Sequence, residues 1–490
     1  MASFSKTQLN KPGQYDLSEL AILSYIEENS LPKKLDLRGI LYNFEISEDI
    51  LNNNIAGSII VYDLNDIRTL FPITGLEKIS LKFSTPGTGV GYDFSEDTGV
   101  PLQVYKVDKI KRDPQNDKGQ FYQIFFCSPE MFRNATTKIS KAYAGPIEVA
   151  IYDILKTYLK SKKPFYFEPT ATNAKYVIPN LKPYDAINYL CSQSIPQKHR
   201  LSAGYMFYET SQGFYFRSVA SMMSYGGLGR EIPYKWAFAS LIAAQTEYDK
   251  QPERKDIERR MSNALSYEFD KPVDVLRNIN DGFYANKLTV HDAFNKTIKT
   301  HTFNYMDSGE VRPHTHMSGK SGLLMPNSND HVGVPFDGID TLSGQANSKT
   351  MVVTETSKVH NDYEFTPTKD TLPYIVHDNA SFRNHNLSLL VFGNTQINAG
   401  DIIQFTSPLL RPEGGDSPYT SGRYIVLALK HVVNVEAQRH EMILKCYKDS
   451  VRNEYPREQD AVFALGQSNQ EIKLFNLYRE QEREQDVAAL

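Results

Sequence analysis

The chain has 490 residues, of which 40% are hydrophobic and 23% are charged, so it can bury a sizeable core. Its formal net charge of −4 excludes a global basic field that would attract nucleic acid or an anionic membrane. The N-terminus lacks the apolar segment of a signal peptide, and no apolar run approaches the roughly 18 residues of a membrane span. We therefore expect a globular protein with no stable membrane insertion.

Residues 1–135 predict an N-terminal arm followed by a small antiparallel β domain. The arm is expected to be irregular apart from a short helical stretch at Asp16–Glu28. Beyond Gly39, apolar and polar residues alternate, which is typical of strands with one buried face. The polar turn Asp113–Gly119 predicts that the last two strands form a hairpin. The expected strands are Leu41–Ile46, Ala56–Asp63, Ile79–Phe83, Val104–Ile110 and Phe121–Cys127.

Residues 136–255 predict an inserted α/β domain. Pro146 and Pro183 each suit the first turn of a helix, and apolar residues follow each proline at helical spacing. The segments Tyr205–Tyr208 and Phe214–Arg217 flank a short polar turn and predict a hairpin.

Residues 256–305 and 385–455 predict a second β unit, and two further segments lie outside it. Residues 306–384 are rich in Gly, Ser, Asn, Asp and His and predict an extended loop insertion with a few weak strands. Residues 456–490 predict a tail with a short amphipathic helix. The strands expected in the second unit are Ala264–Phe269, Gly282–His291, Thr297–Tyr305, Leu387–Phe392, Ile402–Phe405, Arg423–Leu429 and Glu441–Tyr447.

One strand pattern occurs twice, about 325 residues apart. The segments Ile73–Pro86 and Ile397–Pro408 each contain a Gly-acidic turn, then an alternating strand, then Ser/Thr-Pro. A chain that builds the same β unit twice is more often making a symmetric surface than a single catalytic pocket. The residues expected to shape and cap the two turns are Gly75, Glu77, Gly400 and Asp401.

The candidate catalytic and ligand-binding motifs are weak. Gly319-Lys320-Ser321 lacks the preceding glycine and strand of a phosphate-binding loop. His314 and His316 could offer imidazoles to a metal, but two histidines one residue apart in a polar loop are more often simply exposed. The acidic pairs Glu77/Asp108 and Asp401/Glu413 could in principle cleave a glycosidic bond, but no apolar pocket is evident that would raise one pKa. We assign no catalytic, cofactor-binding or metal-binding residue and expect no cofactor.

The C-terminal amphipathic segment is our candidate for docking a partner protein, because its apolar residues have little fold of their own to pack against. They are Ile472, Leu474, Phe475, Leu477 and Tyr478.

Several segments resemble the baseplate central hub protein of contractile-tailed, T-even-like bacteriophages, which is related to the hub part of VgrG-type secretion spikes. The similarity covers most of residues 37–133 and 385–450 and is looser over 139–220. It rests on the order and spacing of segments, since no single motif is diagnostic. They include Gly57–Asp63, Phe71–Glu77, Phe83–Pro86, Val104–Lys111, Ile139–Tyr143, Leu390–Asn394, Ala399–Asp401, Gly422–Val426, Lys430-His431 and Lys448–Ser450.

The resemblance implies a β-rich α+β chain with two tail-tube-like antiparallel β-barrels, the inserted α/β domain, the loop excursion and the C-terminal helix. It further implies a non-enzymatic virion protein, assembled in the host cytoplasm, whose homotrimer presents six quasi-equivalent barrels. The implied partners are the central spike, tube-initiating and tube proteins, and baseplate wedge proteins. The tape-measure protein and DNA would pass through the lumen without sequence-specific binding. A tail-associated peptidoglycan hydrolase and the hub of a type VI-like secretion spike are the alternatives.

Overall fold

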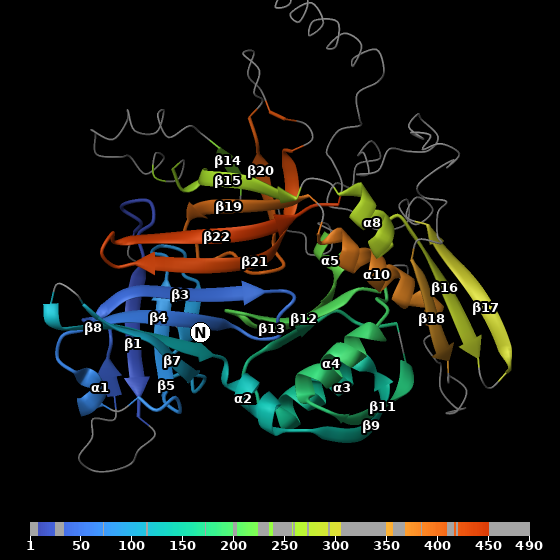
Figure 1. Ribbon diagram of the computed structural model, residues 1–490, viewed down its shortest axis with the longest axis horizontal. Helices are drawn as coiled ribbons and strands as arrows, with labels where there is room; N and C mark the ends of the chain where they lie inside the picture. The colour runs from blue at the N-terminus through green and yellow to red at the C-terminus, as the bar shows by residue number, and fades with distance from the viewer. Residues whose placement is uncertain are drawn as a thin grey trace, which may run out of the picture.

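A computed structural model gives the fold of the chain (Figure 1). It describes residues 8–24, 34–71, 73–113, 116–171, 173–198, 203–223, 235–238, 257, 260–271, 274–292, 295–304, 349–355, 368–383, 385–408, 416–417 and 420–449. None of the helices in these ranges is long and apolar enough to cross a membrane.

Most strands of the described residues belong to one 14-stranded sheet, which contains two β units. The first β unit has the strand order β2-β1-β5-β7-β8-β4-β3, with β6 also paired to β5. Its sheet continues through β3 into β21 of the second unit. The strands of the first unit are β1 (Asp16–Leu23), β2 (Lys34–Asp36), β3 (Leu41–Asp49), β4 (Ala56–Asp63), β5 (Lys78–Ser84), β6 (Gly91–Phe94), β7 (Leu102–Asp113) and β8 (Asn116–Cys127).

The second β unit is a closed six-stranded barrel. Its strands follow the order β21-β20-β14-β15-β19-β22, and β22 pairs back to β21. Closure removes the exposed strand edges that an open sheet would leave. The only tryptophan of the chain, Trp236, lies on β14 and is packed in the core of this barrel. The six strands are β14 (Lys235–Phe238), β15 (Asn263–Lys271), β19 (Asn386–Phe392), β20 (Ile402–Thr406), β21 (Gly422–Asn434) and β22 (Arg439–Tyr447).

The first unit surrounds its own hydrophobic core, which takes residues from nearly all of its strands. Alternation decides which side chains enter it: Ile79, Leu81 and Phe83 of β5 are buried in the core, while Lys82 lies on the opposite face. The described residues of β1 and β3 form no ladder with each other, although both strands contribute to this core. Closure of the first unit into a barrel therefore stays a prediction.

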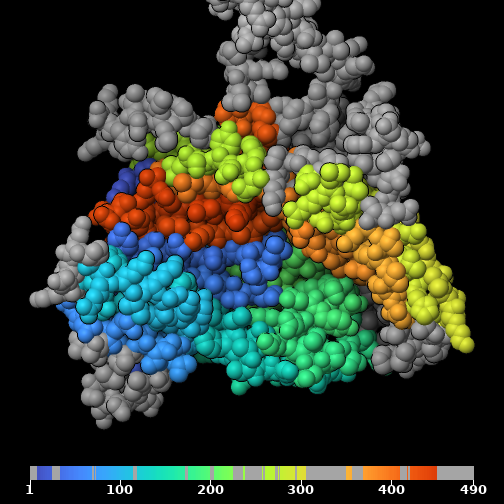
Figure 2. All heavy atoms as spheres, viewed as in Figure 1, coloured from blue at the N-terminus to red at the C-terminus, as the bar shows by residue number. Residues whose placement is uncertain are grey.

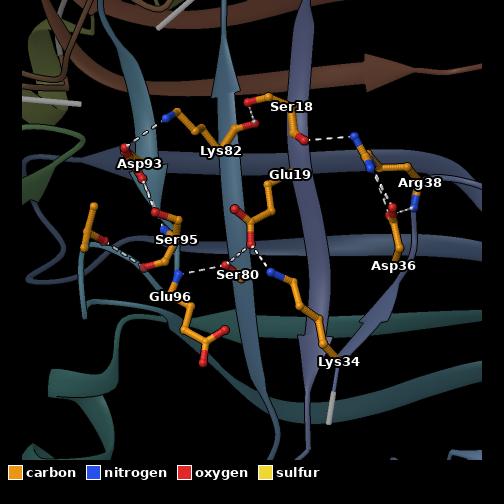
Figure 3. Close-up of polar contacts among 11 residues, drawn as sticks. Ser18, Glu19, Lys34, Asp36, Arg38, Ser80, Lys82, Asp93, Ser95 and Glu96 are labelled. Atoms are coloured by element: carbon orange, nitrogen blue, oxygen red, sulfur yellow. Dashed lines mark hydrogen bonds and ion pairs between the residues drawn. The ribbon is translucent and has the colours of Figure 1, made fainter. Parts of the chain in front are cut away.

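The helix expected at Asp16–Glu28 is wrong where the structure describes that segment. Asp16–Leu23 is strand β1, which pairs antiparallel with β5 and buries Leu20 and Ile22. Polar contacts attach its outer face: the Glu19 carboxylate accepts from Ser80 Oγ at 2.6 Å and from Lys34 Nζ at 2.7 Å (Figure 3). The sequence Leu-Ser-Glu-Leu-Ala-Ile-Leu suits either a helix or a strand, and pairing with β5 decides between them.

The segment between the two units contains helices and two small sheets. The helices predicted after Pro146 and Pro183 are confirmed, as is the hairpin of β12 and β13. Figure 2 shows this green segment packed against the blue first unit. Its elements are α2 (Pro129–Thr136), β9 (Ile139–Pro146), α3 (Ile147–Asp153), the π-helical turn η1 (Ile154–Tyr158), β10 (Phe165–Phe167), β11 (Asn173–Leu181), α4 (Pro183–Ser192), β12 (Tyr205–Thr210), β13 (Gly213–Ser218) and α5 (Val219–Met223).

A separate three-stranded sheet contains β16 and β17, whereas the sequence predicts both strands in the second β unit. β16 pairs antiparallel with β17 and parallel with β18, a strand inside the predicted loop excursion. The remaining elements are α1 (Ile67–Leu70), α8 (Val275–Asp281), β16 (Ala285–Asp292), β17 (Thr297–Asn304), β18 (Thr350–Glu355), the 3-10 turn η6 (Thr368–Asp370) and α10 (Leu372–Ser381).

Candidate functional site: the junction of the two β units

Strand β21 joins the two β units, because one of its edges pairs with both units while its other edge pairs with β22. Residues 422–425 pair with β20 of the closed barrel, and residues 428–434 pair with β3 of the first unit. The junction is antiparallel and includes an ion pair of 2.6 Å between Lys430 Nζ and Glu45 Oε2. Figure 1 shows β15, β19, β22, β21, β3 and β4 stacked one below another across this junction.

The two units are equivalent in their backbone bonding. The Glu77 carbonyl accepts from Val104 N at 2.9 Å, and the Asp401 carbonyl accepts from Val426 N at the same distance. A register shift follows each valine, between Val104 and Lys106 against β8 and between Val426 and Ala428 against β22. Strands β5, β7 and β8 therefore correspond to β20, β21 and β22. This equivalence extends the twofold pattern of the sequence to three strands of each unit.

Glu77 and Asp401 each accept hydrogen bonds from their own turn. Glu77 Oε1 accepts from Thr74 N at 2.8 Å, three residues earlier, and Oε2 accepts from Gly75 N at 2.8 Å. Asp401 Oδ2 accepts from Asn398 N at 2.9 Å, again three residues earlier. These bonds satisfy backbone donors that a turn would otherwise leave without partners, which is what a capping residue does.

The two turn glycines have the same backbone conformation but different surroundings. Gly75 and Gly400 have φ values of 97° and 87°, a region that side chains rarely adopt. A Cβ at Gly75 would meet nothing closer than the Tyr105 carbonyl oxygen at 3.9 Å. A Cβ at Gly400 would overlap the hydroxyl of Tyr208, which lies on β12 of the inserted segment. Gly400 thus also lets the inserted segment approach the barrel.

Glu48 bonds three parts of the chain at this junction, and the sequence analysis missed it. Its carboxylate accepts from Tyr92 Oη at 2.8 Å, from Ser211 N at 2.6 Å and from Ala399 N at 3.0 Å. The side chain is buried, and this burial raises its pKa to about 8. A usable signal was present, since alternation along β3 puts Glu48 on the same face as Phe44 and Ile46.

A buried charge cluster attaches the inserted segment to the first unit. Lys163 Nζ lies 3.1 Å from Glu130 Oε2 and also bonds to Glu209 Oε1, and all three side chains are buried. Burial alone would lower the pKa of Lys163, but the carboxylates of Glu209 and Glu130 raise it above its ordinary value. Glu209 Oε2 in turn accepts from Ile55 N, just before β4, at 3.0 Å.

Other predicted site residues lie outside the described residues. These are His314 and His316 of the loop excursion, Glu413, and the C-terminal segment with Ile472, Leu474, Phe475, Leu477 and Tyr478. Within the described ranges, no group of three or more His, Cys, Asp or Glu side chains could hold a metal ion.

Comparison with known proteins relates the chain to tail proteins by structure alone. No protein-family model and no curated protein matches its sequence. The structure is similar to the tail protein from Neisseria meningitidis MC58, with a TM-score of 0.50 and 7% identity over 89% of this chain and 97% of that chain. The prophage MuSo2 43 kDa tail protein from Shewanella oneidensis matches with a TM-score of 0.48 and 8% identity, over 88% of this chain and 98% of that chain. An Escherichia coli type VI secretion component, described as similar to the T4 bacteriophage tail proteins gp27 and gp5, matches with a TM-score of 0.37 and 8% identity, over 90% of this chain and 78% of that chain.

The first of these matches shows the fold. The chain shares the fold of that tail protein over most of its length.

Proposed function

We propose that this chain is a structural baseplate hub protein of a contractile tail, three copies of which form a ring with pseudo-six-fold symmetry. The observation that carries the proposal is the tandem arrangement of two equivalent β units, joined edge to edge by β3 and β21. Three such chains supply six equivalent units. A ring of this kind can contact a six-fold tail tube on one side and a three-fold central spike on the other.

The face of the joined sheet opposite the cores is our candidate for the channel wall. Val433 of β21 lies opposite Phe44, and both are buried in the core of the first unit. Leu429, four residues earlier on the same face of β21, is buried in the core of the barrel, so both cores lie on one side of the sheet. The other side carries charges of both signs in ion pairs, Lys430–Glu45 at 2.6 Å and Arg439–Glu441 at 2.7 Å. Paired charges produce little net field, which suits the passage of a tape-measure protein and then DNA without sequence-specific binding.

Further partners in this proposal are tube-initiating proteins, tube proteins and baseplate wedge proteins. The chain would then belong to the tail of a virion assembled in the host cytoplasm. The C-terminal segment with Phe475 stays our candidate for partner docking, and deletion of residues 468–490 should weaken partner binding while leaving the trimer intact. An unchanged pull-down of spike or tube protein by the truncated chain would reject that role.

The enzymatic alternative has little support at the junction. Glu77 is buried and both of its carboxylate oxygens accept bonds from its own turn, and Asp401 caps the equivalent turn. A glycosidase needs two carboxyl groups facing a substrate across a cleft. Peptidoglycan clearing by the purified protein, abolished by one carboxylate substitution, would restore that alternative.

The test of the proposed function is the solution mass by light scattering, for the protein alone and with its spike. Since one chain has a mass of 55.7 kDa, three copies give 3 × 55.7, or about 167 kDa. A mass near that value supports the ring. A stable monomer even in the presence of the spike overturns it.

A further inference from the structure

A buried amine lies between two carboxyl groups where the inserted segment meets the first unit. Lys163 Nζ lies 3.1 Å from Glu130 Oε2 and contacts Glu209 Oε1 directly, and the three side chains are at most 5% exposed. They come from different elements, since α2 carries Glu130, β12 carries Glu209, and Lys163 lies between η1 and β10. The fold therefore holds one amine against two carboxyl groups inside the protein.

Aromatic rings line this site. Lys163 Nζ lies 5.3 Å from the ring centroid of Phe94 and 5.5 Å from that of Phe214, and both rings are buried. Apolar walls of this kind lower the local dielectric constant, so charged groups beside them are costly. They also keep out bulk water, which would otherwise compete for the amine and the carboxyl groups.

We propose that Lys163 and Glu209 join in an intramolecular amide bond, with Glu130 as the catalytic residue for its formation. The product is a covalent cross-link between two side chains that are 46 residues apart in sequence. This inference goes beyond the proposed function and does not rest on it, because the reaction takes place inside one chain.

The two carboxyl groups are suited to different roles. Burial raises the pKa of Glu209, and the Glu130 carboxylate adds to this rise, although the charge of Lys163 opposes it. Burial also acts to raise the pKa of Glu130, but the charge of Lys163 holds it below its ordinary value. The reactive form therefore has an ammonium on Lys163, a carboxylate on Glu130 and a protonated carboxyl group on Glu209. An acid and a base thus lie on either side of the amine.

The reaction balances with these three groups alone. Glu130 takes one proton from the Lys163 ammonium, and the neutral amine forms a new N–C bond to the carboxyl carbon of Glu209. The C–O bond to Oε1 then breaks, and Oε1 leaves as water with the carboxyl proton and a second proton of the amine. Glu130 keeps the first proton. The products are an amide, a neutral carboxyl group and one water molecule, so no oxidant, reductant or other reagent is required.

A backbone donor lies where negative charge develops during this reaction. Ile55 N donates to Glu209 Oε2 at 3.0 Å. When the amine attacks, Oε2 becomes an oxyanion, and this N–H group is already in place to stabilise it. The same bond orients the carboxyl group, with Oε2 toward Ile55 and Oε1 toward Lys163. Because Ile55 directly precedes β4, the first unit contributes to a reaction between side chains of the inserted segment.

Burial also favours the product. Before the reaction the site holds an ammonium and a carboxylate away from water, and each ion has a desolvation penalty. Afterwards no ion remains in the site. In water an amine and a carboxylic acid stay ionised because both ions are well hydrated, and that hydration is missing here. Direct contact between the reacting groups further removes the entropy cost of bringing them together.

An exposed ion pair of the same segment provides a matched comparison within the protein. Lys141 Nζ lies 2.7 Å from Asp153 Oδ2, but these side chains are 42% and 32% exposed. Water stabilises both ions of that pair, so we expect it to stay ionic. Contact between an amine and a carboxylate is therefore not sufficient for a cross-link, and burial distinguishes the two pairs.

The experiment is mass spectrometry of the full-length protein in denaturing solvent, followed by tryptic mapping. The wild type should be lighter than its sequence mass by one water molecule. Trypsin should release residues 163–175 and 201–217 as one branched peptide, while cleavage after Lys141 proceeds normally. The reference is Lys163→Arg, which keeps the positive charge, offers no amine and should have its full sequence mass. The wild-type map gives a result even if a variant misfolds.

Glu130→Gln tests the catalytic role, because glutamine keeps the shape of the side chain but cannot take the proton. Masses recorded at successive times after cell-free synthesis should show cross-linking at least about 100-fold slower than in the wild type, with the fold checked by circular dichroism. Equal rates in a folded variant would overturn the role of Glu130.

Two results would overturn the cross-link itself or its explanation. A wild type with its full sequence mass and two separate peptides would show that the buried groups remain an ion cluster. Linkage of Lys141 to Asp153 as well would overturn the argument from burial. Neither result changes the light-scattering mass of the assembly, so failure of the cross-link can be distinguished from failure of the proposed ring.

Discussion

Replacing Gly400 by alanine should destabilise the closed barrel because it combines backbone strain with a steric overlap. A side chain at φ 87° costs about 1 kcal/mol relative to glycine. The added Cβ would also overlap the Tyr208 hydroxyl and lie 3.0 Å from its Cζ. Tyr208 is buried and stacks on Tyr215, with ring centroids 5.6 Å apart, so it cannot move freely. Overpacking of this kind costs about 1–3 kcal/mol, which brings the expected loss to about 2–4 kcal/mol.

Trp236 provides a local assay for this loss. It is the only tryptophan, it is buried, and it lies opposite Phe405 of β20, the strand that follows Gly400. Because a chain with several units need not unfold in one step, we compare midpoints of the fluorescence transition in urea. With a typical dependence on urea of about 2 kcal/mol per molar, a loss of about 2–4 kcal/mol should lower the midpoint of Gly400→Ala by about 1–2 M.

Two controls separate strain from overlap. Tyr208→Phe removes the overlapping hydroxyl, so Gly400→Ala should cost less in that background than in the wild type. Gly75→Ala tests strain alone, because its Cβ would meet only an oxygen at 3.9 Å, and it should cost about 1 kcal/mol by circular dichroism. The reasoning would be refuted if Gly400→Ala cost no more than Gly75→Ala, or if Tyr208→Phe gave no relief.

Three further substitutions test the buried polar groups. Burial raises the pKa of Glu48 from 4.5 to about 8, so this residue lowers the stability of the wild type as pH rises between those values. Glu48→Gln should remove that component from the pH profile of the melting temperature, and parallel profiles would contradict it. Lys163→Met should cost about 3–5 kcal/mol in thermal unfolding, because it leaves the Glu130 and Glu209 carboxylates buried without a cation; a cost below about 1 kcal/mol would contradict a buried charge cluster. Glu77→Ala leaves two backbone donors of its turn without acceptors and should cost about 1–3 kcal/mol, with faster amide exchange in that turn than in the wild type.

The helices and most strands could be predicted locally because their patterns have only one interpretation. Pro146 and Pro183 begin apolar runs at helical spacing, and alternating runs such as Ile79–Phe83 can bury one face only as strands. The helix predicted over the β1 segment was wrong because the apolar pattern of this segment suits both the helical period and the strand period. Its state depends on pairing with β5, about 60 residues away in sequence, and no local pattern contains that information.

The residues of the candidate site also differ in whether the local sequence could identify them. The Gly-acidic turns could be found because glycine at positive φ and a nearby capping acid are local requirements, and both acids do bond to their own turns. The burial of Glu48 could have been found from alternation along β3, but its partner Ala399 could not, because the two residues meet only when the units pack together. Lys163 could not be assigned, because no local pattern places it beside Glu130 and Glu209.

The residues alone show that the chain is β-rich and carries the same strand pattern twice, because alternation and turn chemistry act over a few residues. Closure of the second unit into a barrel, and the place of β21 in both units, depend on how distant strands pair in three dimensions. Strand order and register arise from backbone pairing between distant segments. Because burial of both cores on one side of the sheet selects that pairing, strand order and register are properties of the whole fold.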